Sequence, residues 1–315
     1  MTKKYLKYIG NVLTIISIIF ITRRLVVMDI EYDKLLTIQN ITWLIILTVV
    51  YAVHLLMIPF SWWRIIEIIT RKKLPYCYVQ KTFCKSNIMK YIPGNVFQYV
   101  GRNEIAIDYN FRHTDIAFST VLDIVANILG VGVIALIGFF LGRETIFQKY
   151  EWTIEQKWIE YGMVVFVILI LLLLIFRKHI QKIWHCYENI FSKKNFKKFA
   201  GCILWYVFFA IYTGTIYILI LSKMMNISFD GISQICLIIG AYQLSWLFGF
   251  LLPGAPGGVG VREFILSILL GPYFDMNIIM FAIVIYRLIN TIGDFLALTV
   301  ADINYKKSSH LNTKI

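Results

Sequence analysis

The sequence predicts an all-α integral membrane protein, a polytopic helical bundle of about eight spans with broken or re-entrant helices. The chain of 315 residues is 59% hydrophobic and has a mean hydropathy of +0.71. Three long runs contain no Asp, Glu, Lys or Arg: Leu35–Trp63, Phe199–Ser222 and Gly231–Val261. A helix needs about 20 mostly apolar residues to cross a bilayer. Because lipid offers no hydrogen-bond partners, such runs must be helical, or broken only where protein surrounds the break.

The predicted spans follow these apolar runs along the chain. They lie at residues 7–22, 40–60, 115–141, 158–176, 199–222, 232–252, 259–271 and 276–300. The first follows a lysine-rich start and resembles a signal peptide. Arg23 and Arg24 follow it in place of a small-residue cleavage site, so we expect a retained span. Segment 259–271 is too short to cross alone and is expected to work with the broken backbone before it. Segment 79–101 is apolar but interrupted, which predicts a re-entrant element.

The distribution of basic residues predicts the orientation. Segments 64–90 and 177–198 each carry seven Lys or Arg residues, and cytoplasmic loops are enriched in these residues. With eight crossings, both termini are expected on the cytoplasmic side of the inner membrane. The net charge of +13 fits such loops and contact with anionic lipid, rather than a nucleic-acid partner. We expect one transmembrane domain over 1–315, with possible repeat halves 1–157 and 158–315 and no soluble catalytic domain.

Two Pro-Gly breaks, each followed by charged residues, divide the apolar sequence. They read "KYIPGNVFQYVGRNE" (Lys90–Glu104) and "LPGAPGGVGVRE" (Leu252–Glu263). The corresponding residues are Pro93, Gly94, Arg102 and Glu104 in the first stretch and Pro256, Gly257, Arg262 and Glu263 in the second. The likeness suggests an internal repeat. Paired interrupted segments in two halves of a transporter indicate a binding site.

The chemistry of the second break favours an anion. Proline blocks a helix and glycine allows unusual backbone conformations. A helix that restarts near Val259 would expose unpaired N–H groups, and Arg262 in its first turn adds a fork that suits phosphate. Arg102 and Lys90 are expected to help hold that phosphate. The alternative is that Arg262 and Glu263 pair statically within the bundle and that Pro-Gly marks a loop.

Further charges fall inside predicted spans. Asp123 precedes a long uncharged stretch, and Arg287 and Asp294 lie two turns apart on one face of the last span. Each must face protein or water. They are expected to line a polar path or to pair with Arg102 and Arg262, the alternative being static ion pairs. His54, alone in an apolar span, is expected to be a packing or interface residue.

The motifs resemble a known family. "LPGAPGGVGVRE" is similar to the Pro-x-x-Pro-Gly-Gly-x-Gly-x-x-Glu signature of the lysylphosphatidylglycerol synthase transmembrane family. "KYIPGNVFQYVGR" resembles its earlier Lys-x-x-Pro-Gly…Gly-Arg element, and "YRLINTIGDF" resembles its closing span. The resemblance implies a flippase-like domain, which in bifunctional relatives translocates aminoacylated phosphatidylglycerol. No soluble aminoacyl transferase domain is evident here, so we do not expect this chain to make lysyl-phosphatidylglycerol.

The resulting prediction is a lipid flippase-like transporter of cell-envelope lipid or glycan biosynthesis, not an enzyme. Its expected partner is an anionic phospholipid, glycolipid or polyprenyl phosphate, with envelope-biosynthesis enzymes as possible partners. No cofactor or metal is expected. The five cysteines show no ligand spacing, which argues against a zinc site or a disulfide framework. The candidate substrate-binding residues are Lys90, Pro93, Gly94, Arg102, Glu104, Asp123, Pro256, Gly257, Gly258, Arg262, Glu263, Arg287 and Asp294.

Two other functions remain open from the sequence. Asp29, Glu31 and Asp33 follow the first span and could hold a divalent cation for a polyprenol-dependent glycosyltransferase. The same acids also fit a solvated loop of mixed charge. Alternatively, the chain could be a non-catalytic partner that anchors an envelope-synthesis complex through its basic segment 177–198.

Overall fold

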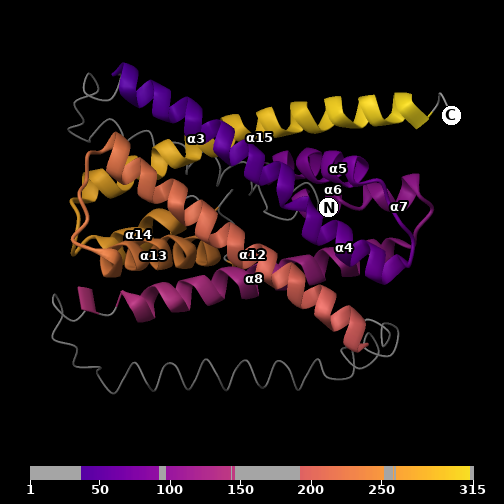
Figure 1. The fold of residues 1–315 in the computed structure, drawn as a ribbon, viewed down its shortest axis with the longest axis horizontal. Helices are drawn as coiled ribbons and strands as arrows, with labels where there is room; N and C mark the ends of the chain where they lie inside the picture. Colours follow the sequence, from indigo (N-terminus) through magenta and orange to yellow (C-terminus); the bar gives the residue numbers. More distant parts are fainter. Residues whose placement is uncertain are drawn as a thin grey trace, which may run out of the picture.

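A computed structural model describes residues 37–91, 97–142, 144–145, 192–251, 258 and 260–312. The regular structure of these residues is helical (Figure 1). The principal helices are α3 (Ile38–Met57), α4 (Pro59–Thr70), α5 (Tyr76–Ile88), α6 (Phe97–Gly101), α7 (Glu104–Asp108), α8 (His113–Leu141), α12 (Lys193–Leu219), α13 (Ile232–Leu251), α14 (Val261–Leu270) and α15 (Met276–Asn312). The 3₁₀ turn η1 (Met89–Tyr91) follows α5, and the π turn η3 (Ile220–Met224) follows α12.

Five helices in the described part are long and apolar enough to cross a membrane. They are Ile38–Thr70, His113–Leu141, Asn195–Met224, Ile232–Leu251 and Met276–Ser309. The predicted spans 40–60, 115–141, 199–222, 232–252 and 276–300 are therefore confirmed as helices. The predicted spans 7–22 and 158–176 lie outside the described residues. So do Asp29, Glu31 and Asp33, and residues 177–191 of segment 177–198.

Two helices run beyond their predicted ends. The 40–60 span continues to Thr70 because Pro59, which lacks an N–H, occupies the first position of α4, where no helical bond is lost. Beyond it, Trp62 and Ile66 are fully buried. The last helix passes residue 300 as an amphipathic helix on which Asp302 pairs with Lys81 at 3.1 Å and with Lys306 at 2.8 Å. A prediction from hydropathy ends a span at the first charged residues. These two helices continue beyond that point because their further residues contact other parts of the protein.

The described residues on either side of each Pro-Gly stretch form a helical hairpin, called here a broken hairpin. In the first hairpin, residues 76–108, α6 packs back on α5 and η1: a Cβ added to Gly101 would lie 3.1 Å from Ser86 Cβ of α5 and 2.7 Å from Met89 Sδ of η1. In the second hairpin, residues 232–270, α14 returns along the end of α13. Gly258 makes this return possible, since its φ is +71° and an added Cβ would lie 2.8 Å from the Gly249 carbonyl oxygen.

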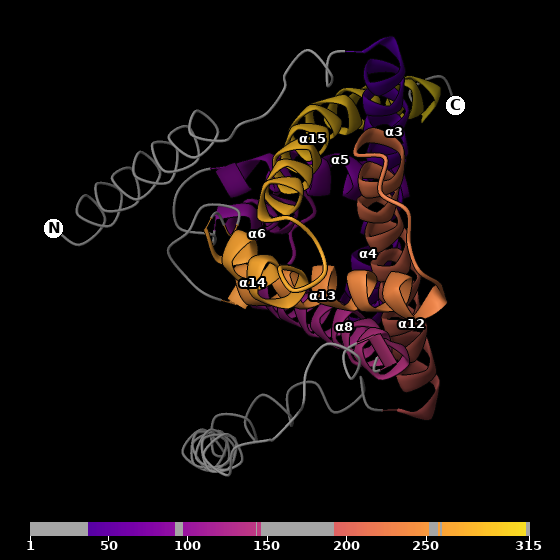
Figure 2. The same ribbon diagram turned by 90° about the vertical axis from the view of Figure 1, so that its left-hand side faces the viewer.

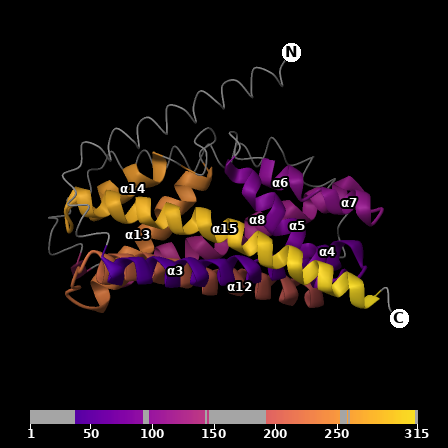
Figure 3. The ribbon, with the colours of Figure 1, turned by 90° about the horizontal axis from the view of Figure 1, so that it is seen from above.

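The two hairpins enter the bundle from opposite ends (Figures 1 and 3). The second hairpin replaces the predicted span 259–271 with the shorter helix α14, which begins at Val261. The predicted re-entrant segment 79–101 corresponds to α5, η1 and α6. The hairpins meet where the Tyr99 ring of α6 stands edge-on to the Phe250 ring of α13, with centroids 6.2 Å apart.

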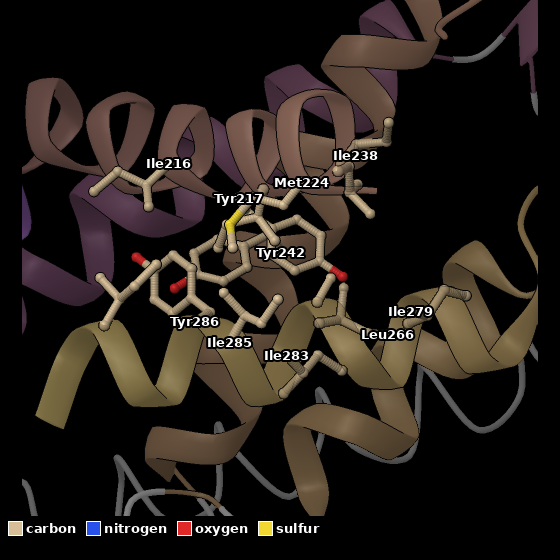
Figure 4. Packing of buried hydrophobic residues seen from close by; sticks show 14 of the residues in the cluster. Ile216, Tyr217, Met224, Ile238, Tyr242, Leu266, Ile279, Ile283, Ile285 and Tyr286 are labelled. Atoms are coloured by element: carbon tan, nitrogen blue, oxygen red, sulfur yellow. The ribbon is translucent and has the colours of Figure 1, made fainter. Parts of the chain in front are cut away.

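Close helix crossings and an aromatic core hold the long helices together. Gly138 of α8 and Gly240 of α13 touch, since a Cβ added to Gly138 would lie 2.6 Å from Gly240 Cα. Tyr217, Tyr242 and Tyr286 project from α12, α13 and α15 into one buried cluster (Figure 4). The Tyr242 ring centroid lies 5.1 Å from that of Tyr217 and 5.0 Å from that of Tyr286. Tyr242 and Tyr286 of this cluster also line the cavity described next.

Candidate functional site

A cavity of about 530 Å³ lies inside the bundle, between the two broken hairpins. Figure 2 shows α3, α8, α12, α13 and α15 arranged around this region. Its volume is within the usual range for small-molecule sites. Four cationic side chains line it: Lys90 of η1, Arg102 of the turn after α6, Arg262 of α14 and Arg287 of α15. The sequence-predicted basic residues therefore share one site, although they come from opposite ends of the chain.

Arg102 is held by a carboxylate and surrounded by rings. Its Nη1 lies 2.8 Å from Oδ2 of Asp123, and the Tyr206 hydroxyl donates to Asp123 Oδ1 at 2.6 Å. Both charged residues are buried, at 8% and 2% exposure. The guanidinium carbon also lies 4.3 Å from the Phe83 ring centroid. Ring faces and a carboxylate stabilise a buried guanidinium, so this pair is a fixed part of the cavity wall.

Lys90 belongs to a polar cluster around Asp294, which is fully buried on α15. Lys90 Nζ lies 2.6 Å from Asp294 Oδ2, and the Tyr91 hydroxyl donates to the same oxygen at 2.5 Å. Asn87 Nδ2 donates to Oδ1 at 3.0 Å. Burial and the neighbouring carboxylate raise the pKa of the Tyr91 phenol well above its ordinary value, which keeps it a donor. The first hairpin is therefore tied to α15 by this carboxylate.

Glu263 ties the second hairpin to the same helix. Its Oε1 forms an ion pair with Arg287 Nη2 at 2.7 Å, and its Oε2 accepts from the backbone N–H of Gly260 at 2.7 Å. The first turn of α14 is thus capped by the chain's own carboxylate. The predicted restart near Val259 is corrected to Val261, and one backbone donor expected to face an anion is satisfied internally.

Arg262 is the cation without such a partner. Among the described residues it has no carboxylate within ion-pair distance, and its buried Nε–H donates to no acceptor. Its guanidinium carbon lies 6.0 Å from the Trp246 ring centroid. Gly249 leaves room for it, because an added Cβ would lie 2.7 Å from Arg262 Cγ. The Arg262 side chain therefore places at the cavity a positive charge that no carboxylate of the described residues neutralises.

Several predicted site residues lie elsewhere. Glu104 pairs with Lys85 at 2.7 Å on a half-exposed surface and is not part of the cavity lining. Asp294 and Glu263 stand behind the cations rather than lining the cavity. Gly258 serves the backbone contact in the second hairpin. Pro93, Gly94, Pro256 and Gly257 lie outside the described residues.

The cavity also contains residues that the charge pattern did not indicate. Uncharged polar and aromatic side chains of several helices line it, among them Tyr51, Asn127, Tyr206, Gln243, Trp246 and Asn290. His54 has the expected packing role, since its ring stacks on Tyr212 with centroids 5.7 Å apart, but it also lines the cavity. Burial raises the pKa of Tyr99, another lining residue, to about 12. A tyrosine combines an apolar ring with a polar hydroxyl, which suits this wall, but the lining tyrosines come from separate elements and no spacing in the sequence marks them.

Comparison with protein families shows to which family the chain belongs. Residues 11–297 match the family described as the lysylphosphatidylglycerol synthase TM region. The chain belongs to this family. Comparison with curated proteins gives no match. In this member of the lysylphosphatidylglycerol synthase TM family, the long apolar helices make a multi-pass membrane protein, and both family-like Pro-Gly stretches contribute a cation to one cavity.

Proposed function

We propose that this protein is a transporter, not an enzyme, that moves the anionic head group of a membrane lipid between leaflets during cell-envelope synthesis. One observation carries the proposal: four cations line a cavity between two broken hairpins that enter from opposite ends. A charged head group cannot enter hydrocarbon without a large cost. A cavity that supplies fixed cations and hydrogen-bond donors lowers that cost along the path.

The outer surface of the bundle suits the lipid tails. Large apolar side chains such as Leu136, Leu204 and Phe295 are exposed on α8, α12 and α15. The acyl or prenyl chains would stay against these faces while the head group passes through the cavity. Arg262 would hold the phosphate, because the other three cations already have buried carboxylate partners.

The arrangement of charged ends supports an orientation. Helix α4 and helix α15 end at the same end of the bundle (Figure 1). Basic residues follow or close both helices: Arg71, Lys72 and Lys73 after α4, and Lys306 and Lys307 in α15. Positive charge marks the cytoplasmic side, so we place this end there, in the inner membrane and with both termini cytoplasmic.

Head-group accessibility in proteoliposomes tests the proposal. Purified protein is reconstituted with a trace of head-group-labelled phosphatidylglycerol, and a membrane-impermeant quencher is added outside. Quenching is expected to pass the outer-leaflet share with wild-type protein and to stop near that share with Arg262→Gln. Arg64→Gln, which removes a half-exposed cation on α4, is the matched control and is expected to behave like wild type. Quenching confined to the outer leaflet in all samples would overturn transport.

A further inference from the structure

The charges at the cavity are nearly balanced. Among the described residues, four cations line it, and three of them contact a carboxylate: Lys90 with Asp294, Arg102 with Asp123, and Arg287 with Glu263. The short gaps beside the site, residues 92–96, 252–257 and 259, contain no charged side chain. Four positive charges against three negative ones leave one positive charge, located on Arg262.

This balance limits the charge that a head group should carry. An unpaired charge in a buried site is costly, so a ligand of charge −1 completes the neutralisation. A phosphodiester carries one negative charge. A phosphomonoester carries about −1.5 to −2 at pH 7, which would leave excess negative charge beside Asp123. An ammonium or aminoacyl group would add positive charge beside cations and would be repelled.

The rest of the cavity wall is polar without being charged. Asn127 of α8 and Asn290 of α15 present amides, and Asn290 Oδ1 has no hydrogen-bond partner among the described residues. Tyr242 and Tyr286 add phenols beside Arg262. Amides and phenols bond hydroxyl groups as donors and as acceptors without changing the charge. The remainder of the head group should therefore be uncharged and hydroxylated, as in glycerol, a polyol or a sugar.

We infer that the ligand of this cavity is a monoanionic phosphodiester lipid with an uncharged, hydroxyl-bearing head group. This inference rests on the proposed function for the route that the lipid takes. What it adds is the chemical class of the ligand. It separates this chain from a carrier of aminoacylated lipid and from a carrier of polyprenyl monophosphate. Arg262 sets the specificity through the single charge that it contributes.

Selectivity among acyl-labelled lipids of matched chain length tests the inference. The probes are phosphatidylglycerol, phosphatidate, phosphatidylethanolamine and lysyl-phosphatidylglycerol, each followed by reduction of its label from outside. Phosphatidylglycerol is expected to move about tenfold faster than each of the others, since one misplaced charge in a partly buried site has an effect of this order. Equal or faster movement of phosphatidate or of lysyl-phosphatidylglycerol would overturn the ligand class and leave transport standing.

A charge variant gives a second test. Asn127→Asp adds one negative charge to the cavity with little change in shape, so the excess falls to zero. The preference for phosphatidylglycerol over phosphatidylethanolamine is expected to shrink about tenfold. Asn277→Asp is the matched control, because Asn277 is exposed near the start of α15, away from the cavity. An unchanged preference in Asn127→Asp would count against the charge balance.

Binding in detergent separates this inference from transport. Short-chain forms of the four lipids are added to purified protein, and Tm is measured. The largest rise is expected with phosphatidylglycerol, and the rise should be lost in Arg262→Gln. If phosphatidylglycerol binds but no lipid moves, the proposed transport fails and the ligand class stands. If no lipid raises Tm, or phosphatidate raises it most, the ligand class is wrong.

Discussion

Arg287 and Asp294 lie two turns apart on α15, and each pairs with a charge from a different broken hairpin. Arg287 Nη2 is 2.7 Å from Glu263 of the second hairpin, and Asp294 Oδ2 is 2.6 Å from Lys90 of the first. One helix thus fixes two elements that enter from opposite ends. Helix α15 contributes a cation to its contact with the second hairpin and an anion to its contact with the first. Each hairpin can therefore pair with only one of the two positions along α15. This arrangement holds Lys90 and Arg287 at one cavity.

Removal of the Asp294 charge is expected to destabilise the protein strongly. In Asp294→Asn the Lys90 ammonium, whose side chain is 19% exposed, loses its carboxylate. Breaking a buried pair on one side costs about 3–5 kcal/mol. Thermal unfolding followed by thiol-reactive dye labelling of buried Cys84 and Cys202 measures the effect. Lys90→Met combined with Asp294→Asn should recover part of the loss; a double variant no more stable than the single one contradicts the pairing.

Loss of the exposed pair of the first hairpin is expected to have little effect. Lys85 and Glu104 are 2.7 Å apart, but their side chains are 47% and 41% exposed. Surface pairs contribute about 0–1 kcal/mol. Glu104→Gln should therefore unfold close to the wild-type temperature and move lipid at the wild-type rate. A transport defect as large as that of Arg262→Gln would show instead that Glu104 takes part in the lipid-binding site.

Gly249→Ala is expected to displace Arg262. The added methyl would lie 2.7 Å from Arg262 Cγ and 3.0 Å from its Nε, so the flexible side chain must shift rather than the helix. We expect weaker binding of phosphatidylglycerol with little loss of stability, measured as the lipid-induced rise in Tm. Gly132→Ala on α8 is the control, because nothing lies within 4 Å of an added Cβ there. Equal lipid responses in the two variants would show that the position of Arg262 is unimportant.

Part of this structure follows from sequence because hydrocarbon imposes it. Long apolar runs predict five of the described helices, and the cost of a charge in lipid places Arg287 and Asp294 inside the bundle. Their partners could not be predicted, since Lys90 lies far from Asp294 in sequence and only the hairpin geometry joins them. The motif placed Glu104 beside Arg102, yet α7 begins at Glu104 and turns its side chain toward Lys85. The spacing of two residues in sequence near a helix break therefore does not determine the directions in which their side chains point.

A link between the two hairpins is expected to stop lipid movement while leaving lipid binding intact. Tyr99 and Phe250 meet with ring centroids 6.2 Å apart, and a head group that crosses from one end must pass between the hairpins that carry them. In a background without native cysteines, Tyr99→Cys with Phe250→Cys is treated with a short bifunctional thiol reagent. The treated double variant should lose transport but keep its rise in Tm with phosphatidylglycerol. Each single-cysteine variant, treated in the same way, controls for the modification itself. Undiminished transport after complete linking would mean that the hairpins need not separate, and that the head group takes a route outside the cavity.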